Sequence, residues 1–113
     1  MVTAEITINR DKRECSLLVK GHAGHSIPGQ DIVCASVTIL AYTAAQVIKC
    51  MGEADKLEGS PILELEGGDA TLSCRAISDE VFSDLLQTFY TIEIGYKLLE
   101  FNYPQYVRLN AST

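Results

Sequence analysis

The 113-residue sequence is poor in residues that several kinds of site require. It has no tryptophan and only two histidines, His22 and His25, so a mechanism that needs an imidazole has two candidates. Its four cysteines form no C-x-x-C pair, and a zinc site built from both histidines and Cys34 would lack the close ligand pairs of structural sites. We therefore expect no metal, no other cofactor and four free thiols at positions 15, 34, 50 and 74.

Basic residues are also scarce, since 9 Lys and Arg against 15 Asp and Glu give a net charge of −6. Nucleic acid and anionic membranes repel such a protein, so neither is an expected partner. A basic protein substrate would suit the charge, although the charge would also serve solubility alone. The glycine-containing segment 21–29 lacks the Lys-Ser/Thr pair of a phosphate-binding loop, so no nucleotide site is expected. The first residues lack the features of a signal peptide, which predicts a cytoplasmic protein.

Length and hydrophobic pattern predict one domain over residues 1–113. Alternating apolar residues predict strands at 2–8, 16–20, 62–66, 70–76 and 106–109. Apolar residues three or four apart predict one helix from residue 32 to about Gly52 and another, capped by Ser78, reaching residue 99. The longest apolar stretch, 32–48, is shorter than a bilayer requires and is interpreted as a buried helix. The order β-β-α-β-β-α-β predicts an α+β fold with two helices packed on a mixed, mostly antiparallel sheet.

The second predicted helix has more apolar surface than one core-facing stripe needs. Phe82, Leu86 and Tyr90 form a stripe beside the main one, which runs from Val81 to Leu99. Such an excess is typical of a dimer contact, and wide burial in the core would explain it equally well.

The residues with chemical potential lie where segment 21–29 meets the first helix, in the string G-H-A-G-H-S-I-P-G-Q-D-I-V-C-A from residue 21 to 35. Asp31 is a plausible N-cap, which would place Cys34 in the first turn beside N–H groups that have no intrahelical partner. These groups and the helix dipole favour a thiolate, so Cys34 is the candidate nucleophile. The same N–H groups would stabilise the oxyanion of an acyl transfer. The plain alternative is that Cys34 is a small, inert hydrophobic residue.

The candidate base is His22, which follows the second strand and is separated from Cys34 by eleven residues. His25 is a rival, but no strand would hold it in place. Asp31 could orient the imidazole as the third member of a triad. As a cap, however, its carboxylate would be occupied, and its negative charge near Cys34 would oppose the thiolate. We favour a Cys-His dyad in which Asp31 caps the helix and anchors the loop.

The strings G-H-A-G at 21–24 and D-I-V-C-A at 31–35 closely resemble the bacterial ribosomal-processing cysteine proteases, the Prp family. The resemblance implies that His22 is the catalytic histidine and Cys34 the nucleophile. It implies a homodimeric α+β protein that removes an N-terminal extension from the twenty-seventh large-subunit ribosomal protein during ribosome maturation. The substrate would bind to a loop that contains Gly21, Ala23, Gly24, His25 and Gly29. The alternative is a small acidic adaptor without catalytic activity that binds a basic protein partner.

Overall fold

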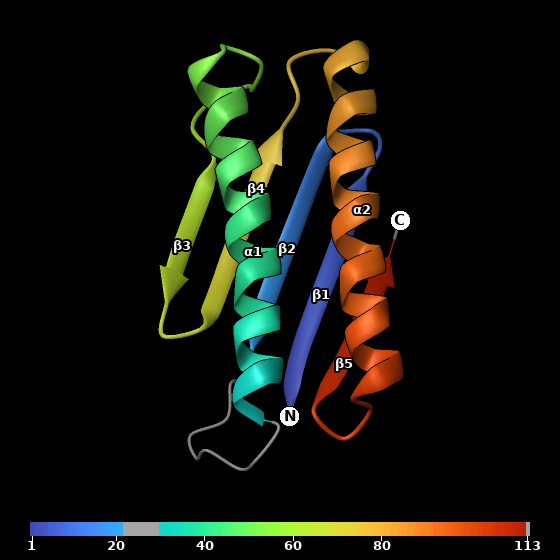
Figure 1. Ribbon diagram of the computed structural model, residues 1–113. Coiled ribbons are helices and arrows are strands. Elements are labelled where there is room, and N and C mark those ends of the chain that lie inside the picture. The colour runs from blue at the N-terminus through green and yellow to red at the C-terminus, as the bar shows by residue number, and fades with distance from the viewer. Residues whose placement is uncertain (22–29, 113) are drawn as a thin grey trace.

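The computed structural model describes residues 1–21 and 30–112, and of Gln30 and Asp31 it describes the backbone only. Two helices cover one face of a five-stranded sheet (Figure 1). The predicted order of elements and the α+β architecture are confirmed. The elements are β1 (Val2–Asn9), β2 (Glu14–Lys20), α1 (Gln30–Glu53), β3 (Ile62–Glu66), β4 (Asp69–Arg75), α2 (Asp79–Asn102) and β5 (Val107–Ser112).

The strands lie in the order β3-β4-β2-β1-β5. Short turns join β1 to β2 and β3 to β4, and these pairs are antiparallel, as is the pair of β2 with β4. The β3–β4 turn consists of Gly67 and Gly68, both at positive φ (58° and 93°), the geometry of a two-residue hairpin that favours glycine. Helix α2 carries the chain back across the sheet, so β5 pairs with β1 in parallel and the sheet is mixed.

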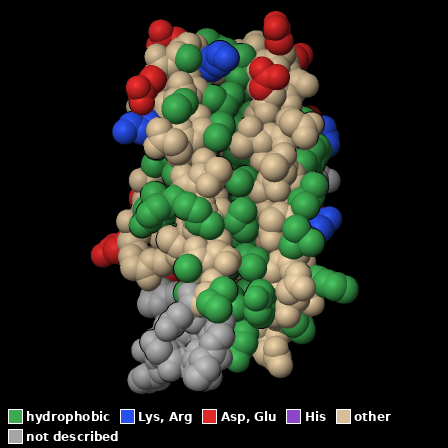
Figure 2. All heavy atoms as spheres, viewed as in Figure 1, with side chains coloured by type: hydrophobic (Ala, Val, Ile, Leu, Met, Phe, Trp, Pro, Cys, Tyr) green, Lys and Arg blue, Asp and Glu red, His purple; other side chains and the backbone are tan. Residues whose placement is uncertain are grey.

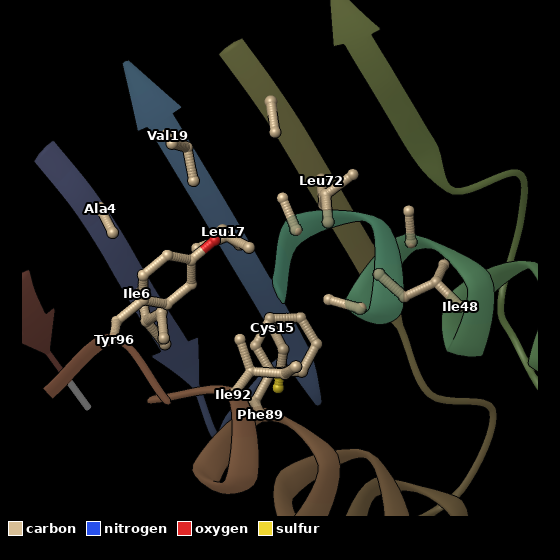
Figure 3. Packing of buried hydrophobic residues seen from close by; sticks show 14 of the residues in the cluster. Ala4, Ile6, Cys15, Leu17, Val19, Ile48, Leu72, Phe89, Ile92 and Tyr96 are labelled. Atoms are coloured by element: carbon tan, nitrogen blue, oxygen red, sulfur yellow. The ribbon is translucent and has the colours of Figure 1, made fainter. Parts of the chain in front are cut away.

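The core lies between the helices and the sheet. Alternate residues of β1, β2 and β4 are buried there, as their period-two pattern predicts. From α2, Phe89, Ile92 and Tyr96 pack against this face near Ile6 and Leu17 (Figure 3). The intervening residues of each strand lie on the opposite face, which neither helix covers in Figure 1.

Helix α1 is longer than the sequence predicts. It begins at Gln30, so Asp31 lies inside its first turn rather than before it, and it extends to Glu53 because Gly52 does not interrupt it. The apolar stretch 32–48 is thus part of a longer helix, and by length and composition alone residues 32–53 could cross a bilayer. In the structure the helix packs on the sheet and on α2, as the core helix of a globular protein does, and its buried stripe is Val33, Val37, Ala41, Ala44, Ala45 and Ile48.

Helix α2 begins as predicted. Ser78 is its N-cap, and the Ser78 hydroxyl accepts a hydrogen bond of 3.2 Å from the backbone N–H of Val81. The stripe of Phe82, Leu86 and Tyr90 is packed against the core, so wide core burial is the correct explanation of it. A different stripe, Ile94, Leu98 and Phe101, is exposed instead.

Candidate active site

Cys34 is a free, partly exposed thiol near the start of α1. Because the helix begins at Gln30, Cys34 is its fifth residue and not the third, as an N-cap at Asp31 would make it. By α-helical geometry its own N–H points to the carbonyl of Gln30, so the unpaired N–H groups lie in the turn before it. Side chains in a helix tilt toward the N-terminus, which directs the sulfur toward that first turn. The sulfur therefore lies about one turn from the unpaired N–H groups.

The side chains next to Cys34 lie on two different sides of α1. Val33 is fully buried against the sheet, whereas its neighbour Ile32 is largely exposed. The hydroxyl of Ser36 donates a hydrogen bond of 2.8 Å to the backbone carbonyl of Ile32. This hydroxyl is therefore not free to donate to the sulfur of Cys34. Cys34 lies between the buried and the exposed side, which allows it to be accessible and yet firmly placed.

Gly21 follows β2 directly and is the described residue of the predicted substrate loop. Its φ is +87°, and a Cβ on it would lie 2.5 Å from the carbonyl oxygen of Met1. Only glycine avoids both the positive-φ strain and this contact. The chain therefore leaves the sheet in a direction set by its close approach to the N-terminal residue, and Figure 1 places the N-terminus and the start of α1 at the same end of the molecule.

The remaining predicted site residues lie outside the described part of the chain. These are His22, Ala23, Gly24, His25 and Gly29, together with the side chain of Asp31. The structure thus positions the two ends of the segment, Gly21 and the first turn of α1, and the roles of these residues stay predictions. Within the described ranges, no group of three or more His, Cys, Asp and Glu residues is arranged to hold a metal ion.

Two of the other three cysteines are unsuited to nucleophilic chemistry. Cys15 and Cys74 are directly opposite each other on β2 and β4, and both are buried. Burial raises the pKa of each thiol to about 12, and the neighbouring Cys74 contributes to the shift of Cys15. Cys50 is exposed on α1, and its sulfur accepts a hydrogen bond of 3.6 Å from the side-chain amide nitrogen of Gln46. In the described residues, Cys34 and Cys50 are the accessible thiols.

One contact near the site could not be found from the sequence. The hydroxyl of Tyr96 on α2 donates a hydrogen bond of 3.1 Å to the backbone carbonyl of Val37, three residues after Cys34. Tyr96 was predictable as a core residue from its helical spacing. Its polar partner was not, because a backbone carbonyl 59 residues away leaves no trace in a residue pattern.

Comparison with known proteins identifies relatives of the whole chain and of part of it. Residues 1–108 match the family described as cysteine protease Prp. Over 48 residues the chain is 33% identical to the ribosomal processing cysteine protease Prp of Staphylococcus aureus, in each of two strains. That alignment includes 42% of this chain and 45% of the relative, so the chain spans less than half the length of the curated relatives it matches.

Two solved structures share the fold. Prp from S. aureus in complex with a substrate peptide superposes with a TM-score of 0.69 at 20% identity, covering 98% of this chain and 99% of that one. SMU.848 from Streptococcus mutans gives a TM-score of 0.70 at 20% identity, covering 100% and 96%. At this identity the structures establish the fold alone, and the family assignment depends on the match over residues 1–108. On that match, the chain belongs to the cysteine protease Prp family.

Proposed function

We propose that this protein is a cysteine endopeptidase that removes an N-terminal extension from the twenty-seventh large-subunit ribosomal protein and thereby supports ribosome maturation. The observation that carries the proposal is an accessible free thiol, Cys34, at the position of the family's D-I-V-C motif, in a chain that matches the family over residues 1–108. The S. aureus relative is named a ribosomal processing protease, and its structure contains a substrate peptide.

In the proposed mechanism, His22 takes the proton of Cys34 and the thiolate attacks the scissile carbonyl carbon. The unpaired N–H groups of the first turn of α1 stabilise the oxyanion. His22 then gives its proton to the leaving amine, which releases one peptide and leaves a thioester. Water, deprotonated by the same imidazole, hydrolyses the thioester and restores the thiol. Asp31 lies inside the first turn of α1 and has no part in these proton transfers.

The proposal includes a cytoplasmic location, a homodimer and no direct contact with nucleic acid. The net charge of −6 supports a basic protein as substrate and disfavours nucleic acid. The helices support the dimer: hydrophobic atoms lie along both of them in Figure 2, and their large exposed apolar residues are Ile32, Ile39, Tyr42, Ile94, Leu98 and Phe101.

The test is cleavage of a peptide that spans the junction of the extension, followed by mass spectrometry. Wild type and Cys50→Ala should cut it at one bond, whereas Cys34→Ala should not, because Cys50 is an accessible thiol without the helix-start environment. His22→Ala should lose turnover and His25→Ala should retain it. If Cys34→Ala turns over, the nucleophile assignment fails, and if His25→Ala is the inactive histidine variant, the base role passes to His25. Peptide binding without cleavage by wild type would favour the adaptor.

A further inference from the structure

Strand β3 forms one edge of the sheet, and in Figure 1 no element lies beyond it. Four of its five residues are exposed. Ile62 and Leu65 are among them, with 47% and 38% of their surface accessible. An edge strand presents unpaired backbone N–H and C=O groups, which can pair with another extended chain.

The hairpin geometry identifies which backbone groups are free. In a two-residue turn the carbonyl of the first flanking residue accepts from the N–H of the last, so Glu66 and Asp69 form a hydrogen-bonded pair. Hydrogen-bonded and non-hydrogen-bonded pairs alternate along an antiparallel ladder. Glu64 therefore also bonds to β4, whereas the N–H and C=O groups of Leu63 and Leu65 point away from β4 to the open edge.

The side chains beside this edge divide by chemistry. Leu63 and Leu65 face the helix side, as their buried partners on β4, Leu72 and Ala70, show. Glu64 and Glu66 face the open side of the sheet. There they line a surface hollow of about 210 Å³ together with Lys20, Asp69, Ala70 and Thr71.

The hollow carries an excess of negative charge, since three carboxylates and one ammonium group line it. Within the described residues, neither glutamate takes part in an ion pair, and Oδ1 of Asp69 is covered without a hydrogen-bond partner. A cationic side chain placed there would pair with the two exposed glutamates.

The hollow lies at the end of the sheet where β2 leads into Gly21, on the face opposite the helices. Val19 pairs with Ala70, and the next residue of β2, Lys20, lines the hollow and directly precedes Gly21. A chain laid along β3 would thus run toward the end of the sheet from which the His22 loop departs.

We propose that the edge of β3 binds, by strand addition, an extended segment of the protein substrate in which cationic and apolar residues alternate. The backbone of the segment pairs with Leu63 and Leu65, its cationic side chains lie beside Glu64 and Glu66, and its apolar side chains lie beside the two leucines. That the partner is the substrate rests on the proposed function. The binding of such a segment to β3 does not.

The first experiment measures binding to the Cys34→Ala protein, labelled for amide NMR, with an eight-residue peptide of alternating Lys and Val. The amides of residues 63 and 65 should shift, and a Glu-Val peptide should leave them unchanged. Methylating those peptide nitrogens that face β3 should weaken binding at least tenfold, and methylating the alternate nitrogens should not. Strand addition would be overturned if the amide signals of residues 63 and 65 do not shift. It would also be overturned if the two methylation patterns weaken binding equally.

The second experiment tests the charges and separates this inference from the proposed function. Glu64→Gln with Glu66→Gln should weaken Lys-Val binding about threefold or more, and should lower kcat/KM for the ribosomal-protein peptide by a similar factor. The matched control, Asp11→Asn with Glu53→Gln, removes two exposed acids at the opposite end of the molecule and should change neither. If wild type cleaves but the glutamines have no effect, the acids serve only to protect the edge from aggregation and the inference fails while the protease stands. If nothing is cleaved but the binding pattern is as described, the edge site stands and the protease fails.

Discussion

Tyr96 on α2 and Val37 on α1 are joined by a hydrogen bond of 3.1 Å from the tyrosine hydroxyl to the valine carbonyl. Tyr96 is completely buried, and burial raises the pKa of its hydroxyl, which keeps it a neutral donor. The adjacent Gly95 allows the close approach, because a Cβ there would lie 2.7 Å from a methyl carbon of Leu40. The two helices are thus held together one turn beyond the candidate nucleophile.

Tyr96→Phe should keep the packing and remove this bond, which lowers the free energy of unfolding by about 1 kcal/mol. Urea denaturation would measure it. Tyr90→Phe is the matched control, because the Tyr90 hydroxyl accepts its 2.8 Å hydrogen bond from Arg10 in an exposed position and its loss should change stability by less than about 0.5 kcal/mol. Equal effects of the two variants would show that the buried bond contributes nothing particular to the helix contact.

The thiols of Cys15 and Cys74 make stability dependent on alkaline pH. In the unfolded chain they lose protons above about pH 8.5, whereas burial in the folded protein holds their pKa values at about 12. The unfolded state therefore binds fewer protons above pH 9, and stability falls as pH rises from 9 toward 12, by at most about 1.4 kcal/mol per pH unit for each thiol. Urea midpoints at pH 8 and pH 10 should differ less in Cys15→Ala/Cys74→Ala than in wild type. An unchanged pH slope in the double variant would exclude these thiols as its source.

The strands of this fold were predictable because the core-facing residues of β1, β2 and β4 alternate with solvent-facing ones. The starts of the helices were less predictable. Ser78 is the N-cap of α2, as the sequence predicts, whereas α1 begins at Gln30, so that Asp31 lies within its first turn. Strand order was not predictable, because residue alternation does not say which neighbour a strand takes, and the exposed edge of β3 depends on that order. Cys34 could be singled out as the candidate nucleophile because a position near a helix start is a local property of the sequence. The Tyr96–Val37 contact was not, because it joins residues distant in the chain.

The homodimer remains a prediction, and the exposed stripe on α2 provides its test. Leu98→Lys should convert a dimer into a species of about 12 kDa in sedimentation at micromolar concentration, since 83% of the surface of the neighbouring Phe101 is also accessible and both would be covered by a partner. Ile77→Lys is the matched control, an exposed apolar residue outside the helices. A wild-type protein that is monomeric throughout would contradict the dimer, and a dimer unaffected by Leu98→Lys would move the interface away from this stripe.

Gly21→Ala tests whether the route of the chain out of β2 matters for catalysis. Alanine at φ +87° is strained by about 1–3 kcal/mol, and its Cβ would be 2.5 Å from the Met1 carbonyl oxygen, which is backbone and cannot turn aside. The strain would be relieved by rotating the chain at residue 21, which redirects His22. We therefore expect kcat for the ribosomal-protein peptide to fall at least tenfold, while iodoacetamide still labels Cys34. Gly59→Ala, also at positive φ (71°) but with open space around its Cβ and in the connection between α1 and β3, is the matched control: it should lose some stability and keep its activity. If both variants lose activity in proportion to stability, the effect is on folding alone, and Gly21 has no part in positioning the base.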